Sequence, residues 1–199
     1  MPTIGLILAG GRGSRLGHRD KAMVDLAGRP LITHAIGRLG PQVDVLAINA
    51  NGDPGRFDFT ALPVIPDLQE PAVGPLGGVL AGLNWVRQHH PDAAWLVTTA
   101  CDTPFIPEDM VKRLLEQGDR ADVIRAASCG GIHHLVAAWR MDLAEPLHHA
   151  IRDGISKVAL FAERFRVATV RFNEEPDPFL NINTPDDLAA AEARLTGRP

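Results

Sequence analysis

Tyrosine is absent from this sequence, and all aromatic residues together make up 5% of it. So few aromatic rings do not favour a platform on which the bases of single-stranded nucleic acid stack. Positive charge is also scarce, because 20 lysines and arginines stand against 24 aspartates and glutamates and the formal net charge is −4. That sign is wrong for a protein that wraps duplex nucleic acid through its phosphates, so no nucleic-acid partner is expected.

Cysteine is nearly missing as well. Cys101 and Cys129 form no CxxC pair, so neither a disulfide framework nor a zinc knot is predicted, and both are interpreted as buried structural thiols. Long apolar runs are lacking, since segments such as residues 4–9 fall far short of the ~20 residues of a membrane span. No secretion signal is recognisable, and we expect a cytoplasmic protein without membrane contact.

Short apolar segments alternate with longer segments of helical period, which predicts an α/β fold with a mostly parallel sheet covered on both faces. Without a repeat or linker, residues 1–199 are expected to form a single domain. Residues 51–67, rich in glycine, proline and aspartate, are interpreted as an irregular surface segment. The expected strands are 3–9, 43–49, 94–100, 122–127, 133–139 and 166–172, and the expected helices are 30–39, 75–89, 107–117, 141–152 and 185–195.

A glycine-rich segment, residues 8–17, follows the first expected strand. Glycine lets backbone N–H groups converge on an anion, but the spacing matches neither Walker A nor GxGxxG, so a plain strand-to-helix turn is an alternative. Between Gly11 and Lys21 there are four basic residues and a single acid, although the chain as a whole is acidic. Such a cationic loop at a strand end favours binding of a polyphosphate, through Arg15 and Lys21.

Two aspartates are candidate ligand-binding residues. Asp102 ends an apolar strand, where one carboxylate can hold Mg²⁺ beside phosphate oxygens, or can instead form a turn before Pro104. Asp67 is either a turn residue or an acceptor for the N1–H and N2–H donors of guanine. Glycines at 74, 77, 78 and 82 leave one face of the expected helix 75–89 without side chains. Such a face allows close approach either of a flat ligand or of the sheet.

Near the C-terminus, Thr184 and Asp187 form a capping box around Pro185, a structural motif. Asn181 and Asn183 alternate, so both amides are expected on one side of an extended segment. His133 and His134 are not interpreted as a pair of metal ligands, because adjacent residues of a strand point to opposite faces of the sheet.

Together these segments resemble the molybdenum cofactor guanylyltransferase (MobA) family over the whole length. In chain order they are Leu8-Ala9-Gly10-Gly11, Arg15-Leu16-Gly17, Asp20-Lys21, Gly28-Arg29-Pro30-Leu31, Asn49-Ala50-Asn51, Gly74-Pro75-Leu76-Gly77-Gly78, Cys101-Asp102-Thr103-Pro104-Phe105 and Asn181-Ile182-Asn183-Thr184-Pro185. The resemblance implies a Rossmann-like, three-layer α/β/α nucleotidyltransferase that transfers GMP from Mg-GTP to molybdopterin-bound molybdenum cofactor and releases pyrophosphate.

The resemblance also implies roles for individual residues. Arg15, Lys21 and Asp102 would be catalytic, with Asp102 the Mg²⁺ ligand. Gly11 favours GTP, because the relatives that use CTP read Leu-Ala-Ala-Gly there. The GTP contacts would be Leu8, Ala9, Gly10, Gly11, Lys21, Asn49, Asp67 and Asp102, and Gly74, Gly78, Asn181 and Asn183 would line the substrate pocket.

The chain departs from the family at two places in the half expected to face the pterin. His134 replaces a common proline, and Ile155-Ser156 replaces basic residues after Gly154. Alternatives are a sugar-1-phosphate guanylyltransferase, a molybdenum cofactor cytidylyltransferase or a non-catalytic nucleotide-binding module. A monomer is expected, in transient contact with other cofactor-biosynthesis proteins or molybdoenzyme chaperones.

Overall fold

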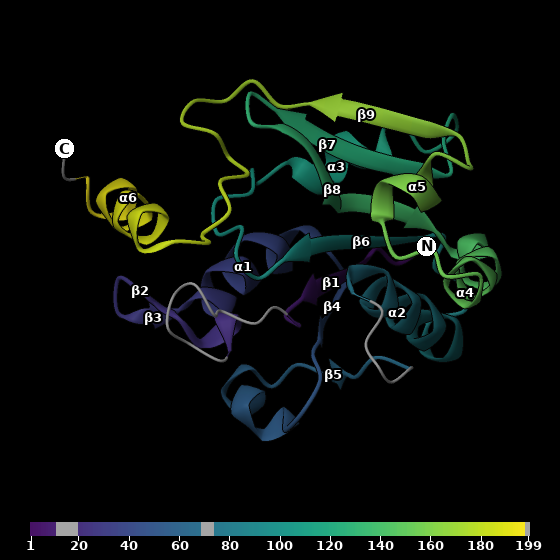
Figure 1. Cartoon of the computed structure of the whole chain (residues 1–199), viewed down its shortest axis with the longest axis horizontal. Coiled ribbons are helices and arrows are strands. Elements are labelled where there is room, and N and C mark those ends of the chain that lie inside the picture. Colours follow the sequence, from purple (N-terminus) through teal and green to yellow (C-terminus); the bar gives the residue numbers. More distant parts are fainter. Residues whose placement is uncertain (11–19, 69–73, 198–199) are drawn as a thin grey trace.

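The computed structural model describes residues 1–10, 20–68 and 74–197, and a seven-stranded sheet runs through its centre (Figure 1). The strand order is β5-β4-β1-β6-β8-β7-β9, and all pairings are parallel except those of β8 with β6 and β7. The strands are β1 Ile4–Leu8, β4 Val45–Asn49, β5 Val64–Ile65, β6 Trp95–Ala100, β7 Val123–Ser128, β8 Gly131–Arg140 and β9 Val167–Arg171.

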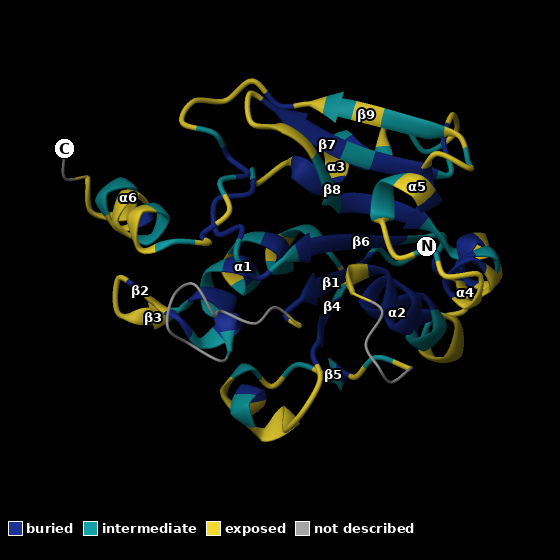
Figure 2. Cartoon of the chain, viewed as in Figure 1, coloured by how far each residue is buried: buried dark blue, intermediate teal, exposed yellow. Residues whose placement is uncertain are grey.

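Helices cover both faces of this sheet and make three layers. They are α1 Leu31–Leu39, α2 Pro75–His89, α3 Met110–Leu115, α4 Ala144–Arg152, α5 Val158–Ala162 and α6 Pro185–Thr196. Apolar residues of α2, α4 and α5 form one buried cluster with the sheet, and those of α1 and α3 form another. Figure 2 shows that the central strands are largely buried. The predicted α/β/α class with a mostly parallel sheet is confirmed.

A third, smaller cluster holds α6 beside a short hairpin. The hairpin strands are β2 Asp25–Leu26 and β3 Arg29–Pro30, joined by Ala27 and Gly28, which both have positive φ. Ile182 and Ala191 pack here with Leu26 and Leu31. Thr184 and Asp187 form the predicted capping box, so α6 begins where the sequence indicates.

The antiparallel strand β8 follows β7 after the two residues Cys129 and Gly130, which form a tight hairpin turn. A turn this short can join only antiparallel strands, because a parallel crossover needs a dozen residues or more. The turn also corrects one prediction. Cys101 is buried as expected, but Cys129 is exposed because it lies at the tip of the hairpin.

The carboxyl ends of the three central strands lie at one level. Leu8, the last residue of β1, pairs with Asn49 at the end of β4 and with Ala100 at the end of β6. Ligands of open α/β sheets bind outside such ends, where the strand order reverses. Within residues 1–10, 20–68 and 74–197, no helix is both long and apolar enough to cross a bilayer.

Candidate active site

A cavity of about 280 Å³ lies at these strand ends and gathers most of the predicted GTP contacts. Arg15 and Gly11 lie outside the described residues. Ala9 is buried in a core cluster and does not line the cavity, and its N–H donates to the Asn49 carbonyl over 2.8 Å. The cavity is lined by Leu8, Gly10, Lys21, Asn49, Asn51, Asp67, Gly74, Pro75, Ala100, Cys101, Asp102 and Leu135.

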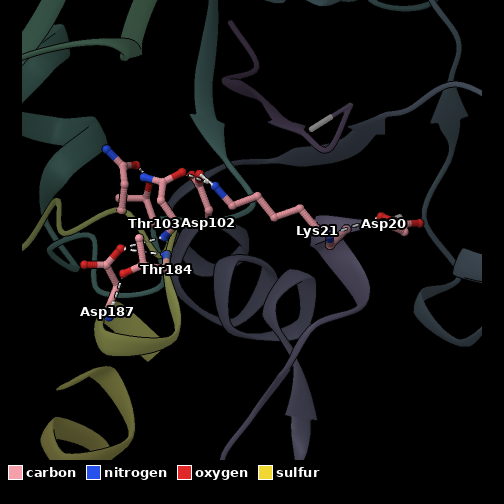
Figure 3. Close-up of polar contacts among 9 residues, drawn as sticks. Asp20, Lys21, Asp102, Thr103, Thr184 and Asp187 are labelled. Carbon is pink, nitrogen blue, oxygen red and sulfur yellow. Dashed lines mark hydrogen bonds and ion pairs between the residues drawn. The ribbon is translucent and has the colours of Figure 1, made fainter. Parts of the chain in front are cut away.

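Lys21 supplies a fixed positive charge at one end of this cavity. Its Nζ forms an ion pair with Asp102 and donates to Asn183 Oδ1 over 2.6 Å (Figure 3). The 3₁₀-helix Lys21–Met23 that carries it is capped by Asp20, whose carboxylate accepts from Ala22 N over 3.1 Å. The ammonium is therefore held by three segments at the place where phosphates would lie.

Asp102 stands just past β6 and is anchored through its own backbone. Its carbonyl accepts from Ile182 N over 3.0 Å, and Thr103 Oγ1 beside it donates to Asn181 Oδ1 over 3.0 Å. Among the described residues no backbone N–H donates to the Asp102 carboxylate, so an Asx turn does not explain it. Lys21 contacts Oδ2, whereas Oδ1 makes a long contact of 3.4 Å with Thr103 Oγ1 and keeps a lone pair for a cation.

A divalent cation fits this carboxylate only together with a phosphate ligand. In the described part of the chain, no three His, Cys, Asp or Glu side chains come together as a metal cage. Mg²⁺ commonly binds one or two carboxylates and completes its octahedron with waters and substrate phosphates, so Asp102 beside a polyphosphate suits it. The adjacent Cys101 is no nucleophile, because burial, reinforced by Asp102, raises the pKa of its thiol.

The far end of the cavity presents an oriented carboxylate. Asp67 accepts from Asn49 Nδ2 and from Asn51 Nδ2, one at each oxygen and both over 2.9 Å. Asp67 N in turn donates to Asn51 Oδ1 over 2.8 Å. Each carboxylate oxygen keeps a lone pair, so the group can still accept two parallel N–H donors from a ligand.

Asn51 lies in the motif Asn49-Ala50-Asn51, but the sequence analysis predicts no role for it. Asn49 and Asn51 alternate along the chain as Asn181 and Asn183 do, and this signal could have identified Asn51.

Gly78, predicted to line the substrate pocket, does not line this cavity but packs behind Asn49. A Cβ there would lie 2.2 Å from Asn49 Oδ1 and 2.9 Å from Leu8 Cδ2, so of the two sequence interpretations close packing is the one realised. Gly74, by contrast, lines the cavity with a φ of +71°, a backbone conformation that favours glycine.

Replacing Gly78 with alanine should therefore displace the Asn49 amide from Asp67. We expect a loss of about 1–3 kcal/mol in unfolding free energy and a GTP Kd raised about tenfold, measured by denaturation and by nucleotide titration. Gly37→Ala is the matched control, because Gly37 is an exposed residue of α1 with nothing within 4 Å of its Cβ position. It should leave GTP binding unchanged. Equal GTP affinity in Gly78→Ala and wild type would show that Asn49 needs no such room.

A second cavity, of about 310 Å³, adjoins the first. Asn181 and Asn183 both line it while Ile182 between them is fully buried, which confirms the predicted alternation. Ala100, Asp102 and Leu135 line both cavities, so the two meet at Asp102. The second cavity is lined by Ala100, Asp102, Thr103, Ile132, His133, His134, Leu135, Val136, Asn181 and Asn183.

His133 is a lining residue to which the sequence gave no role. Its Nε2 lies 2.7 Å from Ser128 Oγ, which donates to Asp177 Oδ2 over 2.9 Å. The single serine proton thus goes to Asp177, so Ser128 accepts from His133 and is no activated nucleophile. The His133 ring packs against Phe179 with centroids 4.8 Å apart. Burial lowers the pKa of His133 although the nearby Asp177 carboxylate acts in the other direction, and this favours the neutral ring.

The two departures from the family pattern fall in different places. His134 lines the second cavity, with its ring 3.5 Å from Arg125 Nη1, and burial followed by this guanidinium lowers its pKa. Ile155 instead packs against the core cluster beneath α2 and α4, and neither it nor Ser156 lines either cavity.

Comparison with known proteins agrees with this geometry. The family model of the MobA-like NTP transferase domain matches residues 5–167. The chain belongs to this family. The predictions of the family and of the enzyme class, a nucleotidyltransferase, are confirmed.

Similar proteins carry more specific names. The chain is 46% identical to a molybdenum cofactor guanylyltransferase of Rhodopseudomonas palustris, over 96% of this chain and 92% of the relative. It is 47% identical to one of Cereibacter sphaeroides, over 98% of both. The crystal structure of molybdopterin-guanine dinucleotide biosynthesis protein A from Archaeoglobus fulgidus superposes with a TM-score of 0.78 at 26% identity, over 98% of this chain and 99% of that one.

Proposed function

We propose that this nucleotidyltransferase transfers GMP from Mg-GTP to molybdopterin-bound molybdenum cofactor, forming the guanine dinucleotide cofactor and pyrophosphate. The carrying observation is the junction of two cavities at Asp102 and Lys21, with a carboxylate oriented for guanine at the far end of the first. The names of the relatives support guanine as the base and molybdenum cofactor as the acceptor.

The chemistry asks little of the protein beyond positioning and charge. An oxygen of the acceptor's phosphate attacks the α-phosphorus of GTP, a new P–O bond forms, and the bond to the pyrophosphate oxygen breaks. A phosphate monoester is already a competent nucleophile, so no general base is needed. Lys21 and Arg15 would offset the charge on pyrophosphate, and Mg²⁺ at Asp102 would neutralise the phosphate oxygens.

The first cavity would take GTP. Asp67, oriented by Asn49, would accept N1–H and N2–H of guanine, and the backbone N–H groups of Gly10 to Gly13 would cradle phosphate, as the sequence predicts.

The second cavity would take the pterin. Asn181, Asn183 and His133 would bind its polar edge, and Ile132 and Leu135 offer apolar walls to a flat ring. We expect residues 1–199 to work as one domain, as a monomer in the cytoplasm, in transient contact with other cofactor-biosynthesis proteins or molybdoenzyme chaperones.

Pyrophosphate release from purified enzyme tests the proposal. Mg-GTP with Mo-molybdopterin should give turnover, and Mg-GTP with mannose 1-phosphate or Mg-CTP with Mo-molybdopterin should give little. Turnover only with the sugar phosphate would indicate a sugar-1-phosphate guanylyltransferase, and a preference for CTP a cytidylyltransferase. Nucleotide binding without turnover on any acceptor would indicate a non-catalytic module.

A further inference from the structure

Arg56 lies in the segment that the sequence indicated to be irregular, on the 3₁₀-helix Pro54–Thr60. Its guanidinium donates from Nη2 to the Asn51 carbonyl over 2.8 Å and from Nη1 to the Asp53 carbonyl over 2.6 Å. Its Nε lies 2.6 Å from Asp20 Oδ2, an ion pair without the alignment of a hydrogen bond. The group also stacks over Phe57, 4.5 Å from the ring centroid. One planar cation thus joins four residues.

Two of these partners lead to opposite ends of the nucleotide cavity. Asn51 exchanges two hydrogen bonds with Asp67, the carboxylate at the base end. Asp20 caps the turn that carries Lys21, the ammonium at the phosphate end. Only 24% of the Arg56 side chain and 27% of that of Asp20 are exposed, so solvent screens this contact incompletely.

We propose that Arg56 is a positioning residue that couples the base end of the donor-nucleotide cavity to its phosphate end. Because one planar guanidinium donates to the Asn51 carbonyl through Nη2 and forms an ion pair with the Asp20 carboxylate through Nε, the orientation of Asp67 and the placement of Lys21 depend on each other. Base and triphosphate are then recognised as one unit. The inference rests on the proposed binding of a nucleoside triphosphate in this cavity and adds a residue that itself lines neither cavity.

The decisive experiment alters a residue at the phosphate end of the nucleotide cavity and measures base selectivity at the other end. Asp20→Asn weakens the ion pair at the phosphate end, so coupling through Arg56 should lower the ratio of GTP to CTP affinity about fivefold. Arg56→Gln should lower that ratio about tenfold and should also weaken binding of inorganic triphosphate several-fold. In the Arg56→Gln background, Asp20→Asn should change the base ratio no further. Calorimetric titration of each purified variant with these ligands and Mg²⁺ gives all the values.

Arg113→Gln is the matched control. Arg113 also stacks on a phenylalanine, 3.7 Å from the Phe172 centroid, and pairs with Glu174 and Asp109, but it lines neither cavity. Its loss should leave the base ratio and the triphosphate affinity unchanged. Arg56→Lys keeps the charge beside Asp20 but loses the fork to two carbonyls, so it should show an intermediate base ratio, and it serves as the second variant if Arg56→Gln does not fold.

Several outcomes overturn the coupling. An unchanged ratio of GTP to CTP affinity in Asp20→Asn would show that Arg56 only stabilises its own loop. A lower melting temperature in Arg56→Gln, with unchanged nucleotide and triphosphate affinities, would show the same. The test does not need guanine to be the preferred base. If wild type prefers CTP, the proposed function fails, but the coupling is still measured by the ratio of CTP to GTP affinity. Equal affinity of wild type for the two nucleotides would overturn both the proposed function and the coupling.

Discussion

Replacing Asp102 with asparagine should lower kcat/KM for guanylyl transfer about 10³-fold. The neutral amide is a poor Mg²⁺ ligand and no longer offsets the Lys21 ammonium, so the substitution weakens the metal site and removes the ion pair of Lys21 at the same time. The side chains of Lys21 and Asp102 are only 11% and 15% exposed, so water compensates little. Initial rates of pyrophosphate release across a Mg²⁺ titration measure the effect, and the variant should require more Mg²⁺ for half-maximal rate.

Asp122→Asn is the control for this loss. Asp122 also pairs with a cation, Arg166, over 2.7 Å, but it precedes β7 at the opposite edge of the sheet and lines neither cavity. Its kcat/KM should stay within about twofold of wild type. Should Asp102→Asn keep the Mg²⁺ dependence of wild type, the metal would have to bind elsewhere.

Replacing Asp67 with asparagine should raise the Kd of GTP about 100-fold and that of CTP no more than about threefold. The lost carboxylate oxygen is an acceptor that guanine can use with its N1–H and N2–H donors. The new amide NH₂ would also face Asn49 Nδ2 or Asn51 Nδ2, both of which are donors, so the local network would be disrupted as well. Competition binding with both nucleotides at saturating Mg²⁺ gives the two constants.

Asp58→Asn provides the comparison for Asp67, because Asp58 is an exposed aspartate of the nearby 3₁₀-helix that lines neither cavity. Both nucleotides should bind this variant as they bind wild type. An equal loss of GTP and CTP in Asp67→Asn would reject direct recognition of guanine, leaving Asp67 a purely structural part of the Asn49–Asn51 network.

The sequence predicts the centre of this molecule well for a physical reason. Strands buried on both faces are almost wholly apolar, so β1, β4 and β6 are visible as runs, and parallel strands bring their ends to one edge. Leu8, Asn49 and Asp102 could therefore be assigned to one site although they lie far apart in the chain. Motifs at strand ends added Lys21, Asp67 and the Asn181–Asn183 pair.

What the sequence does not reveal depends on short elements and distant contacts. β5 has two residues and α5 has five, too few for a period to appear. The reversal of β8 left a signal, since the residues between 127 and 133 are too few for a crossover helix. The links from Arg56 to Asp20 and from Ser128 to Asp177 left none, because each joins segments that only the folded chain brings together.

The reversed strand β8 has a consequence for how substrates can change in such enzymes. Because β8 runs antiparallel to β6, its beginning rather than its end reaches the edge occupied by Asp102, and residues 132–136 form a wall of the second cavity. Asp177 binds the β7–β8 turn through Ser128 and Gly130, which ties this wall to the segment before Asn181. Apart from Leu135, the described wall of the first cavity comes from residues up to Asp102. Under the proposed function, the walls that would bind the donor and the acceptor thus come largely from successive stretches of the chain, so substitutions can change the acceptor wall and leave the nucleotide wall intact.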